Sequence, residues 1–148
     1  MKNASNEIEN IAKSLDIPVK LIKKEQFDIL KYYIYDKYID PNVMGVFLWE
    51  RFKDELTSVV CDSDAWMSIG KLVDEKQCIL IIFDEQTAFE FQTPDDMINV
   101  ISETYLLDDF YVTNYSCSYL ICYNHHDYLS CCGNAKEKLL RILNEETK

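Results

Sequence analysis

The stretch from Tyr119 to Gly133, YLICYNHHDYLSCCG, gathers side chains that carry chemistry in many proteins. It holds both histidines of the chain and three of its six cysteines. A cysteine nucleophile needs a histidine base within hydrogen-bond reach, and Cys131 or Cys132 with His125 or His126 would supply both groups. One interpretation is therefore a small enzyme or a metal-binding protein that uses the His125–Cys132 segment.

The spacing of these residues does not favour a metal site. Zinc ligands usually recur as Cys-x₂-Cys or His-x₃-His, so that two side chains converge on the ion. Here the two histidines are adjacent, and so are Cys131 and Cys132. Neighbouring side chains of an extended segment point to opposite faces, so each pair offers one ligand to a face. We expect no metal, and His125, His126, Cys131 and Cys132 are the candidates if one binds.

A structural interpretation explains the same stretch more simply. YLICY is typical of a core strand, residues 124–127 of a polar turn, and YLSCC of a returning strand. Asn and Asp side chains bond to nearby backbone in such turns. We therefore expect Asn124 and Asp127 to stabilise the turn, with His125 or His126 bonding across it.

The remaining sequence offers no other catalytic motif. Glycine occurs only at positions 45, 70 and 133, so no glycine-rich phosphate loop can form, and the Gly-x-Ser-x-Gly pattern of hydrolases is absent. We expect neither catalysis nor a cofactor. The first residues lack the apolar core of a signal peptide, and no run approaches the roughly 18 apolar residues of a membrane helix. These patterns predict a cytoplasmic protein with reduced cysteines.

Acidic residues are concentrated in one part of the chain. The net charge is −11, and residues 61–133 carry thirteen acids against only Lys71 and Lys76. Residues 1–60 are nearly balanced, with ten acids and nine bases. Such a field repels nucleic acid and anionic membranes and speeds association with a basic partner. The charge pattern favours a basic protein as the partner.

Periodicity and turn signals predict a single α+β domain over residues 1–148, with N-terminal helices packed on a mainly antiparallel sheet and a C-terminal helix. Residues 1–60 form its helical part, 61–133 its acidic, sheet-rich part, and 134–148 its last helix. Thr93-Pro94 is a helix start, with a Thr cap and Pro at the first helical position. The predicted helices are 3–15, 19–38, 43–59, 94–104 and 134–148, and the predicted strands are 76–83, 87–92, 110–113, 119–123 and 126–132, with a further strand at 65–69.

The segment YNHHDYLSCCG, preceded by DDFYVT and YLIC, resembles immunity proteins encoded beside polymorphic or contact-dependent toxins. The resemblance covers about residues 100–133. It implies a non-catalytic protein that neutralises a cognate toxin by binding it, and a basic, nuclease-like toxin would suit the charge. An acidic nucleic-acid mimic that inhibits a nuclease is an alternative.

Under the immunity interpretation, exposed acids pair with lysines or arginines of the toxin, while tyrosines anchor the interface. The predicted contact residues are Asp84, Glu85, Glu90, Asp95, Asp96, Asp108, Asp109, Tyr111 and Tyr115.

Overall fold

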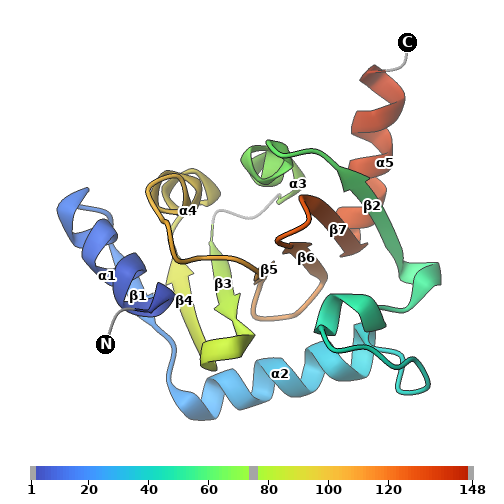
Figure 1. The fold of residues 1–148 in the computed structure, drawn as a ribbon, viewed down its shortest axis with the longest axis horizontal. Coiled ribbons are helices and arrows are strands. Elements are labelled where there is room, and N and C mark those ends of the chain that lie inside the picture. Colours follow the sequence, from blue (N-terminus) through green and yellow to red (C-terminus); the bar gives the residue numbers. More distant parts are fainter. Residues whose placement is uncertain (1–2, 74–76, 147–148) are drawn as a thin grey trace.

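A seven-stranded antiparallel sheet forms the centre of the molecule. The computed structural model describes residues 3–73 and 77–146, and the strand order across the sheet is β1-β4-β3-β5-β6-β7-β2 (Figure 1). The two edge strands, β1 and β2, come from the first sixty-one residues, whereas the five inner strands follow in the later half of the chain. The strands are β1 Val19–Leu21, β2 Thr57–Cys61, β3 Cys78–Ile82, β4 Thr87–Phe91, β5 Phe110–Thr113, β6 Tyr119–Tyr123 and β7 Tyr128–Gly133.

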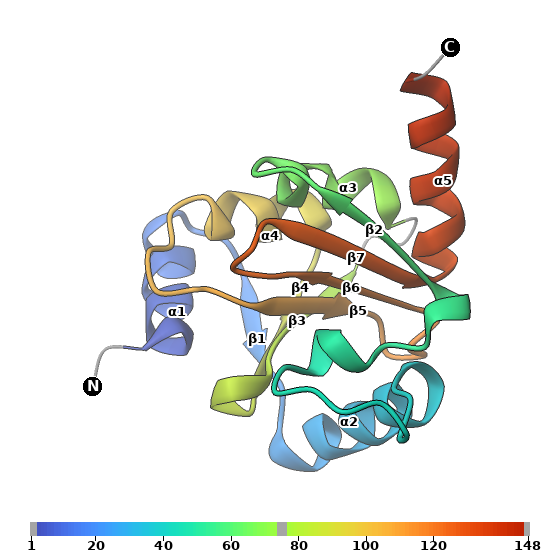
Figure 2. The same cartoon turned by 45° about the vertical axis from the view of Figure 1, so that its right-hand side comes forward.

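Helices cover both faces of the sheet. The long helix α2 (Lys24–Tyr38) lies along one face, and the other face carries α1 (Ala4–Ser14), α3 (Ile69–Leu72), α4 (Pro94–Ile101) and α5 (Asn134–Glu146), as the two views show (Figures 1 and 2). Each face therefore has its own apolar core. The α2 side buries Leu30, Ile34, Ile79, Ile81 and Leu120, and the opposite side buries Ile8, Leu80, Phe89, Met97 and Ile121.

The helix cover explains why β3 is a continuous apolar run. All five residues of CILII are buried, and their side chains alternate between the two cores. A strand covered on both faces needs apolar residues at every position. The predicted strand at 76–83 is thus confirmed over Cys78–Ile82, while its expected start at Lys76 lies outside the described residues.

Local signals placed several elements correctly. The Thr93 side chain accepts a hydrogen bond from the Asp96 amide at 3.1 Å, and Pro94 occupies the first helical position of α4. The hairpin β3–β4 and the strands β5, β6 and β7 lie where the sequence predicted them, and β7 passes directly into α5 at Asn134. The α+β class with a C-terminal helix is confirmed.

The predicted helix over residues 43–59 is wrong. Two short 3₁₀ turns, Leu48–Arg51 and Asp54–Leu56, lead there into strand β2. β2 pairs with β7 over five positions, from Thr57 opposite Cys132 to Cys61 opposite Tyr128. Three of its residues are β-branched and favour extended structure, and the ladder with β7 outweighs the helical spacing of the preceding aromatics.

Two smaller predictions also fail. Val19–Leu21 is not the start of α2 but strand β1, which pairs with β4, and α2 begins at Lys24. Residues 65–69 are not a strand, since a 3₁₀ turn over Ala65–Ser68 runs into α3. Ala65 and Ile69 are both buried, which is the four-residue spacing of one helical face. Residues 1–60 are therefore not purely helical.

The six cysteines are all free thiols, and Cys61 alone among them is exposed. Within the part of the chain that the structure describes, no helix is both long and apolar enough to cross a membrane.

Candidate functional site

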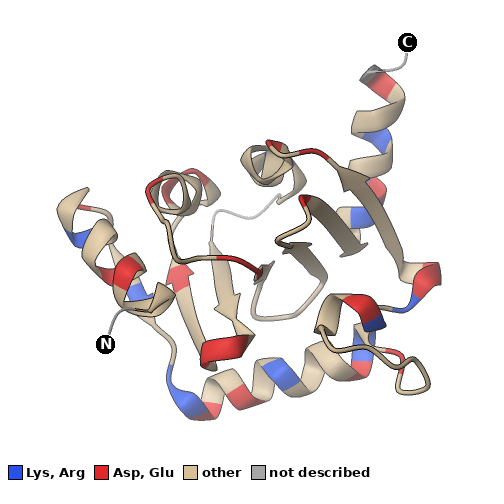
Figure 3. Ribbon diagram, viewed as in Figure 1, with Lys and Arg blue, Asp and Glu red and all other residues tan. Residues whose placement is uncertain are grey.

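One end of the sheet collects four acidic connections. In the antiparallel register, the β3–β4 turn, the residues before β5, the β6–β7 turn and the residues after β2 all lie at the same end. Figure 3 marks acidic residues in each of these connections. We call this region the acidic end, and it consists of Asp62, Asp64, Asp84, Asp108, Asp109 and Asp127.

The β6–β7 turn at the acidic end is fixed by its own polar side chains. The Asn124 side-chain oxygen accepts hydrogen bonds from the amides of His126 (2.9 Å) and Tyr128 (3.1 Å). Asp127 adopts a left-handed backbone conformation with φ of 65°, and its carboxylate accepts a 2.8 Å bond from the Tyr123 hydroxyl. Asn124 thus bonds local backbone as predicted, whereas the Asp127 carboxylate bonds a side chain on β6.

Asp109 ties the segment before β5 to this turn. One of its carboxylate oxygens accepts from the His125 amide at 2.8 Å and lies 2.9 Å from His125 Nδ1. A carboxylate can only accept, so Nδ1 carries the proton and a neutral ring keeps its lone pair on Nε2. The side chain of Asp109 is only 10% exposed. Asp109 therefore has a structural task at the acidic end, which sequence reasoning assigned to a partner contact.

Two aromatic residues pack against the histidine pair. Phe47 and Trp49 stack at 5.4 Å between ring centroids, and Phe47 lies 5.1 Å from His125. The two histidine rings are 4.1 Å apart, and Trp49 lies 6.0 Å from His126. Sequence reasoning missed this cluster, because it placed Phe47 and Trp49 on a helix. A small cavity of about 60 Å³ lies beside it, lined in part by Phe47, Asp84 and Asp109.

The two cysteines of the opening stretch lie in opposite cores. Cys131 belongs to the core under α1, α3, α4 and α5, and Cys132 to the core under α2. Burial raises the pKa of both thiols, that of Cys132 to about 11. The two histidines lie in the turn before Tyr128, the first residue of β7. Cys131 is three residues further along the strand, which corresponds to about 10 Å. The described residues hold no group of three or more His, Cys, Asp or Glu side chains that could hold a metal ion.

The predicted contact residues do not share one surface. Asp84, Asp108 and Asp109 lie at the acidic end. Glu90 lies near the opposite end of the sheet, next to the last residue of β4, and its carboxylate accepts a hydrogen bond from the Tyr115 hydroxyl. Asp95 and Asp96 occupy the first turn of α4, which follows β4.

Two of the predicted contacts have internal roles instead. Tyr111 is only 4% exposed and packs against Phe83 in the core under α2, so its prediction as an interface anchor is wrong. The Glu85 carboxylate accepts from the amides of Ala4 (3.0 Å) and Ser5 (2.9 Å) and from the Ser5 hydroxyl (2.5 Å). A carboxylate at a helix N-terminus stabilises the helix, and Glu85 holds α1 to the β3–β4 turn.

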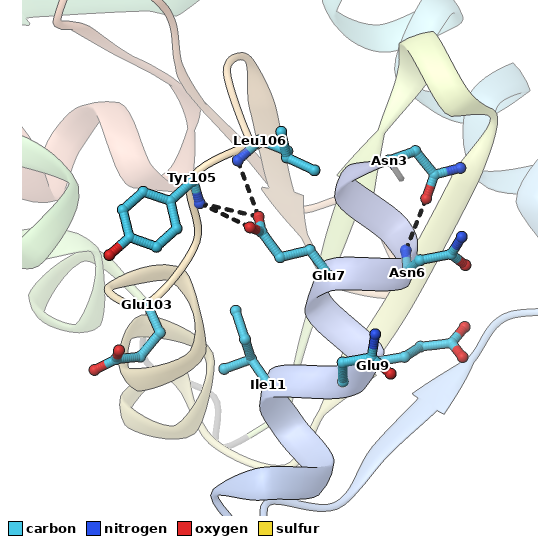
Figure 4. A pocket seen from close by; sticks show the side chains of 9 residues that line it. Asn3, Asn6, Glu7, Glu9, Ile11, Glu103, Tyr105 and Leu106 are labelled. Atoms are coloured by element: carbon cyan, nitrogen blue, oxygen red, sulfur yellow. Dashed lines mark hydrogen bonds between the residues drawn. The ribbon is translucent and has the colours of Figure 1, made fainter. Parts of the chain in front are cut away.

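A larger hollow adjoins the acidic end. It has a volume of about 570 Å³ and lies between α1 and the segment that leads into β5 (Figure 4). The Glu7 carboxylate joins the two walls by accepting from the amides of Tyr105 and Leu106, each at 3.0 Å. The side chain of Tyr105 is 93% exposed. No signal in the sequence linked α1 to this segment, because the contact joins residues almost a hundred positions apart.

Comparison with known proteins places this chain beside a protein family. The model of a family of unknown function (DUF6756) matches residues 2–143, a range that includes the acidic end and the hollow. No match was found among curated proteins or among solved structures. The resemblance to immunity proteins stays a prediction.

Proposed function

We propose that this chain, which belongs to the DUF6756 family, acts by binding a basic protein through the acidic end of its sheet. The observation that carries the proposal is the convergence of four acidic connections at that end. Asp62, Asp64, Asp84 and Asp108 are exposed there. A surface of one sign attracts an oppositely charged partner and guides its approach.

The neighbouring aromatic cluster supports binding over simple solubility. Interfaces combine charged rims with aromatic side chains, which are frequent binding hot spots. Phe47, Trp49 and the two histidines lie beside Asp109 and form such a group, and His125 and His126 are exposed. The acidic end therefore offers both the charge and the apolar contact area that a protein partner needs.

The more specific proposal is that the partner is a toxin and that the chain is its immunity protein. A basic toxin, such as a nuclease, needs cationic residues to hold nucleic acid, and an acidic inhibitor that covers them would block substrate. This proposal rests on the charge of the acidic end and on the resemblance at residues 100–133.

Affinity capture followed by a neutralisation assay tests the function. The tagged chain is incubated with lysate of its native host, and bound proteins are eluted with a salt gradient and identified by mass spectrometry. The captured basic protein is then expressed in a bacterial host with and without this chain. Growth arrest that this chain relieves supports the immunity proposal. A partner that causes no arrest, or an arrest that this chain leaves unchanged, contradicts it.

Charge reversal at the acidic end gives a quantitative prediction. In Asp84→Lys/Asp108→Lys, we expect the association rate with the captured partner to fall at least tenfold in low salt, because two exposed acids that attract it become repulsive. Stopped-flow fluorescence at several salt concentrations measures this rate. The pair avoids Asp109, whose reversal would also break its bonds to His125.

The matched control is Glu55→Lys/Glu145→Lys, which changes the net charge equally at exposed positions away from the acidic end. Equal slowing in both variants would mean that only total charge matters, and the acidic end would lose its role.

A further inference from the structure

We infer that β2, the outermost strand beyond β7 (Figure 1), pairs with an extended segment of the basic partner and so extends the sheet by one strand. The added strand would run antiparallel to β2 and place its basic residues beside Asp62 and Asp64. The inference rests on the proposed function, because the protein that binds the acidic end is taken to supply this strand. It adds backbone hydrogen bonds to the attraction between charges.

The register of β2 shows which of its backbone groups face away from the sheet. The Asp62 amide donates to the Asp127 carbonyl at 3.0 Å, and bonding to a given neighbour alternates along an antiparallel strand. Val60 therefore bonds to β7, whereas the N–H and C=O groups of Val59 and Cys61 point to the free side. Among the residues that the structure describes, none bonds to these outward groups. β2 thus offers donors and acceptors with which an extended chain can pair.

The two edges of the sheet differ in their protection against such pairing. β1 has three residues, one of which is Lys20, and Pro18 directly precedes it. A short strand, a lysine and a proline all hinder the addition of a further strand. β2 has five residues, TSVVC, with neither lysine nor proline, and they pair with β7 in unbroken register. The protection of one edge and not the other is an independent sign that β2 binds a strand.

One face of β2 offers apolar contacts to the added strand. α5 packs over the face that carries Val60, whereas Val59 on the opposite face is 52% exposed. Cys61 and Tyr128 are directly opposite each other on the same face as Val59, and both are exposed. Directly opposite residues of an antiparallel pair share a face. We therefore expect β-branched apolar residues in the partner opposite Val59 and Cys61.

The charges at the two ends of β2 determine the direction of the added strand. Asp62 and Asp64 follow β2, are exposed and belong to the acidic end. Acids and bases balance where β2 begins, at Asp54, Glu55, Lys53 and Lys136. Opposite charges across a strand pair stabilise it, so the basic residues of the partner belong beside Asp62. In an antiparallel strand, that position is the N-terminal end.

A second copy of this chain fits the edge less well. Two β2 strands paired antiparallel about Val59 would bring Asp54 of each copy toward Asp64 of the other, and like charges opposite each other destabilise a sheet. Each copy also carries a net charge of −11, which opposes association. Charge complementarity thus points to a basic segment of a different protein.

A peptide titration of the full chain tests the inference without the natural partner. The probe is acetyl-Lys-Arg-Val-Thr-Val-Thr-Val-amide, whose three valines would lie opposite Cys61, Val59 and Thr57. The readout is the shift of the Val59 and Cys61 backbone amide signals in NMR spectra. We expect saturable shifts, and weaker binding of the peptide with the reversed sequence. The absence of saturable shifts at these two amides overturns the inference, and equal binding of the reversed peptide overturns the direction of the strand.

Methylation of single peptide nitrogens shows whether the backbone carries the binding. In an antiparallel pair, the residue directly opposite Val59 turns its own N–H toward β2, and the next residue turns its N–H away. N-methylation of the central valine should therefore weaken binding at least about tenfold, because it removes one bond and adds bulk at the edge. N-methylation of the first threonine is the matched control and should have a much smaller effect. Equal loss in the two peptides overturns the inference.

A substitution in β2 makes the same test from the side of the protein. Val59→Pro removes an outward N–H that β7 does not use, and proline is tolerated on an edge strand at such a position. We expect this variant to bind the peptide roughly tenfold more weakly. Val59→Thr keeps both the N–H and the branched side chain, and its binding should stay within about twofold. Equal weakening in both variants contradicts the inference. If Val59→Pro does not fold, the methylated peptides decide.

The natural partner separates this inference from the proposed function. If Asp84→Lys/Asp108→Lys weakens partner binding while Val59→Pro does not, the β2 edge plays no part and the proposed function stands. If neither variant weakens partner binding, both fail. Sedimentation of the chain alone tests the second copy as occupant. A dimer that Val59→Pro dissociates would assign the edge to a second copy and overturn the inference.

Discussion

Gly133 is a residue whose identity follows from its surroundings. Its φ is +65°, and an added Cβ would lie 2.7 Å from both the Ser118 carbonyl oxygen and the Tyr38 hydroxyl oxygen. The Tyr38 hydroxyl cannot easily move away, because it is buried and donates a 2.7 Å bond to the Cys117 carbonyl. Gly133 thus permits the close approach of α2 to the end of β7.

We predict that Gly133→Ala lowers the free energy of unfolding by at least about 2 kcal/mol, the sum of a left-handed backbone cost and overpacking. Urea denaturation followed by circular dichroism measures this change. Gly70→Ala is the control, because Gly70 lies within α3 and an added Cβ meets its nearest atom at 3.5 Å. The control should be neutral or stabilising by up to about 1 kcal/mol. Equal losses in the two variants would contradict the argument.

At the scale of elements, one carboxylate ties the first turn of α1 to the β3–β4 turn. Glu85 accepts three hydrogen bonds from the first turn of α1. We predict that Glu85→Ala lowers the free energy of unfolding by about 1–2 kcal/mol, because it removes a helix cap and leaves partly buried amides unpaired. Amide hydrogen exchange should also rise in α1 before it rises in β3.

Asp84→Ala provides the comparison for Glu85, since Asp84 is its exposed neighbour in the same turn. Its effect should stay within about 0.5 kcal/mol, as for most surface positions. If Asp84→Ala costs as much as Glu85→Ala, the turn itself and not the cap determines the stability.

The elements that the sequence predicted well carry their signals locally. β3 is a short apolar block, and the start of α4 has both a Thr cap and a first-turn proline. The two strands that the sequence did not predict are β1 and β2, whose partners lie far away in the chain. A strand that forms by pairing with a distant partner leaves only a weak pattern in its own residues, and the spacing of Phe47, Phe52 and Leu56 suggested a helix instead.

The candidate site was predictable to a similar extent. The turn at residues 124–127 was expected from its Asx residues, and its Asn124 bonds agree. The bonds that Asp109 accepts from His125 and the packing of Phe47 on His125 depend on which strands are neighbours. That order, β3-β5-β6-β7 with β2 outside, cannot be read from periodicity. The burial of Tyr111 and the bonds between Glu85 and α1 were missed for the same reason.

At the scale of the whole molecule, buried thiols and phenols make stability sensitive to alkaline pH. Burial raises the pKa of Cys78 from 9.0 to about 12 and that of Cys132 from 9.0 to about 11. Burial and the bond to Glu90 raise the pKa of Tyr115 from 10.0 to about 12. Above pH 9 these groups lose protons in the unfolded chain first, so unfolding releases protons and becomes easier as pH rises.

We therefore predict that the free energy of unfolding falls as the pH rises from about 9 toward 11–12, the window set by the ordinary and raised pKa values of these groups. Urea titrations at pH 8, 9.5 and 10.5 measure the slope. Cys78→Ala should reduce the slope, because it removes one of the groups with a raised pKa. A free energy that is constant over this range would contradict the prediction.

The position of the edge strands has a consequence for folding kinetics. Strands β3 to β7 pair largely with strands that are close to them in the sequence. In contrast, β1 pairs with β4 and β2 pairs with β7 across roughly 70 residues, and contacts at such separations slow folding. During synthesis, both edge strands leave the ribosome before their partners exist. β1 can pair once β4 emerges, whereas β2 stays unpaired until β7 emerges, so the sheet acquires its second border later than its first.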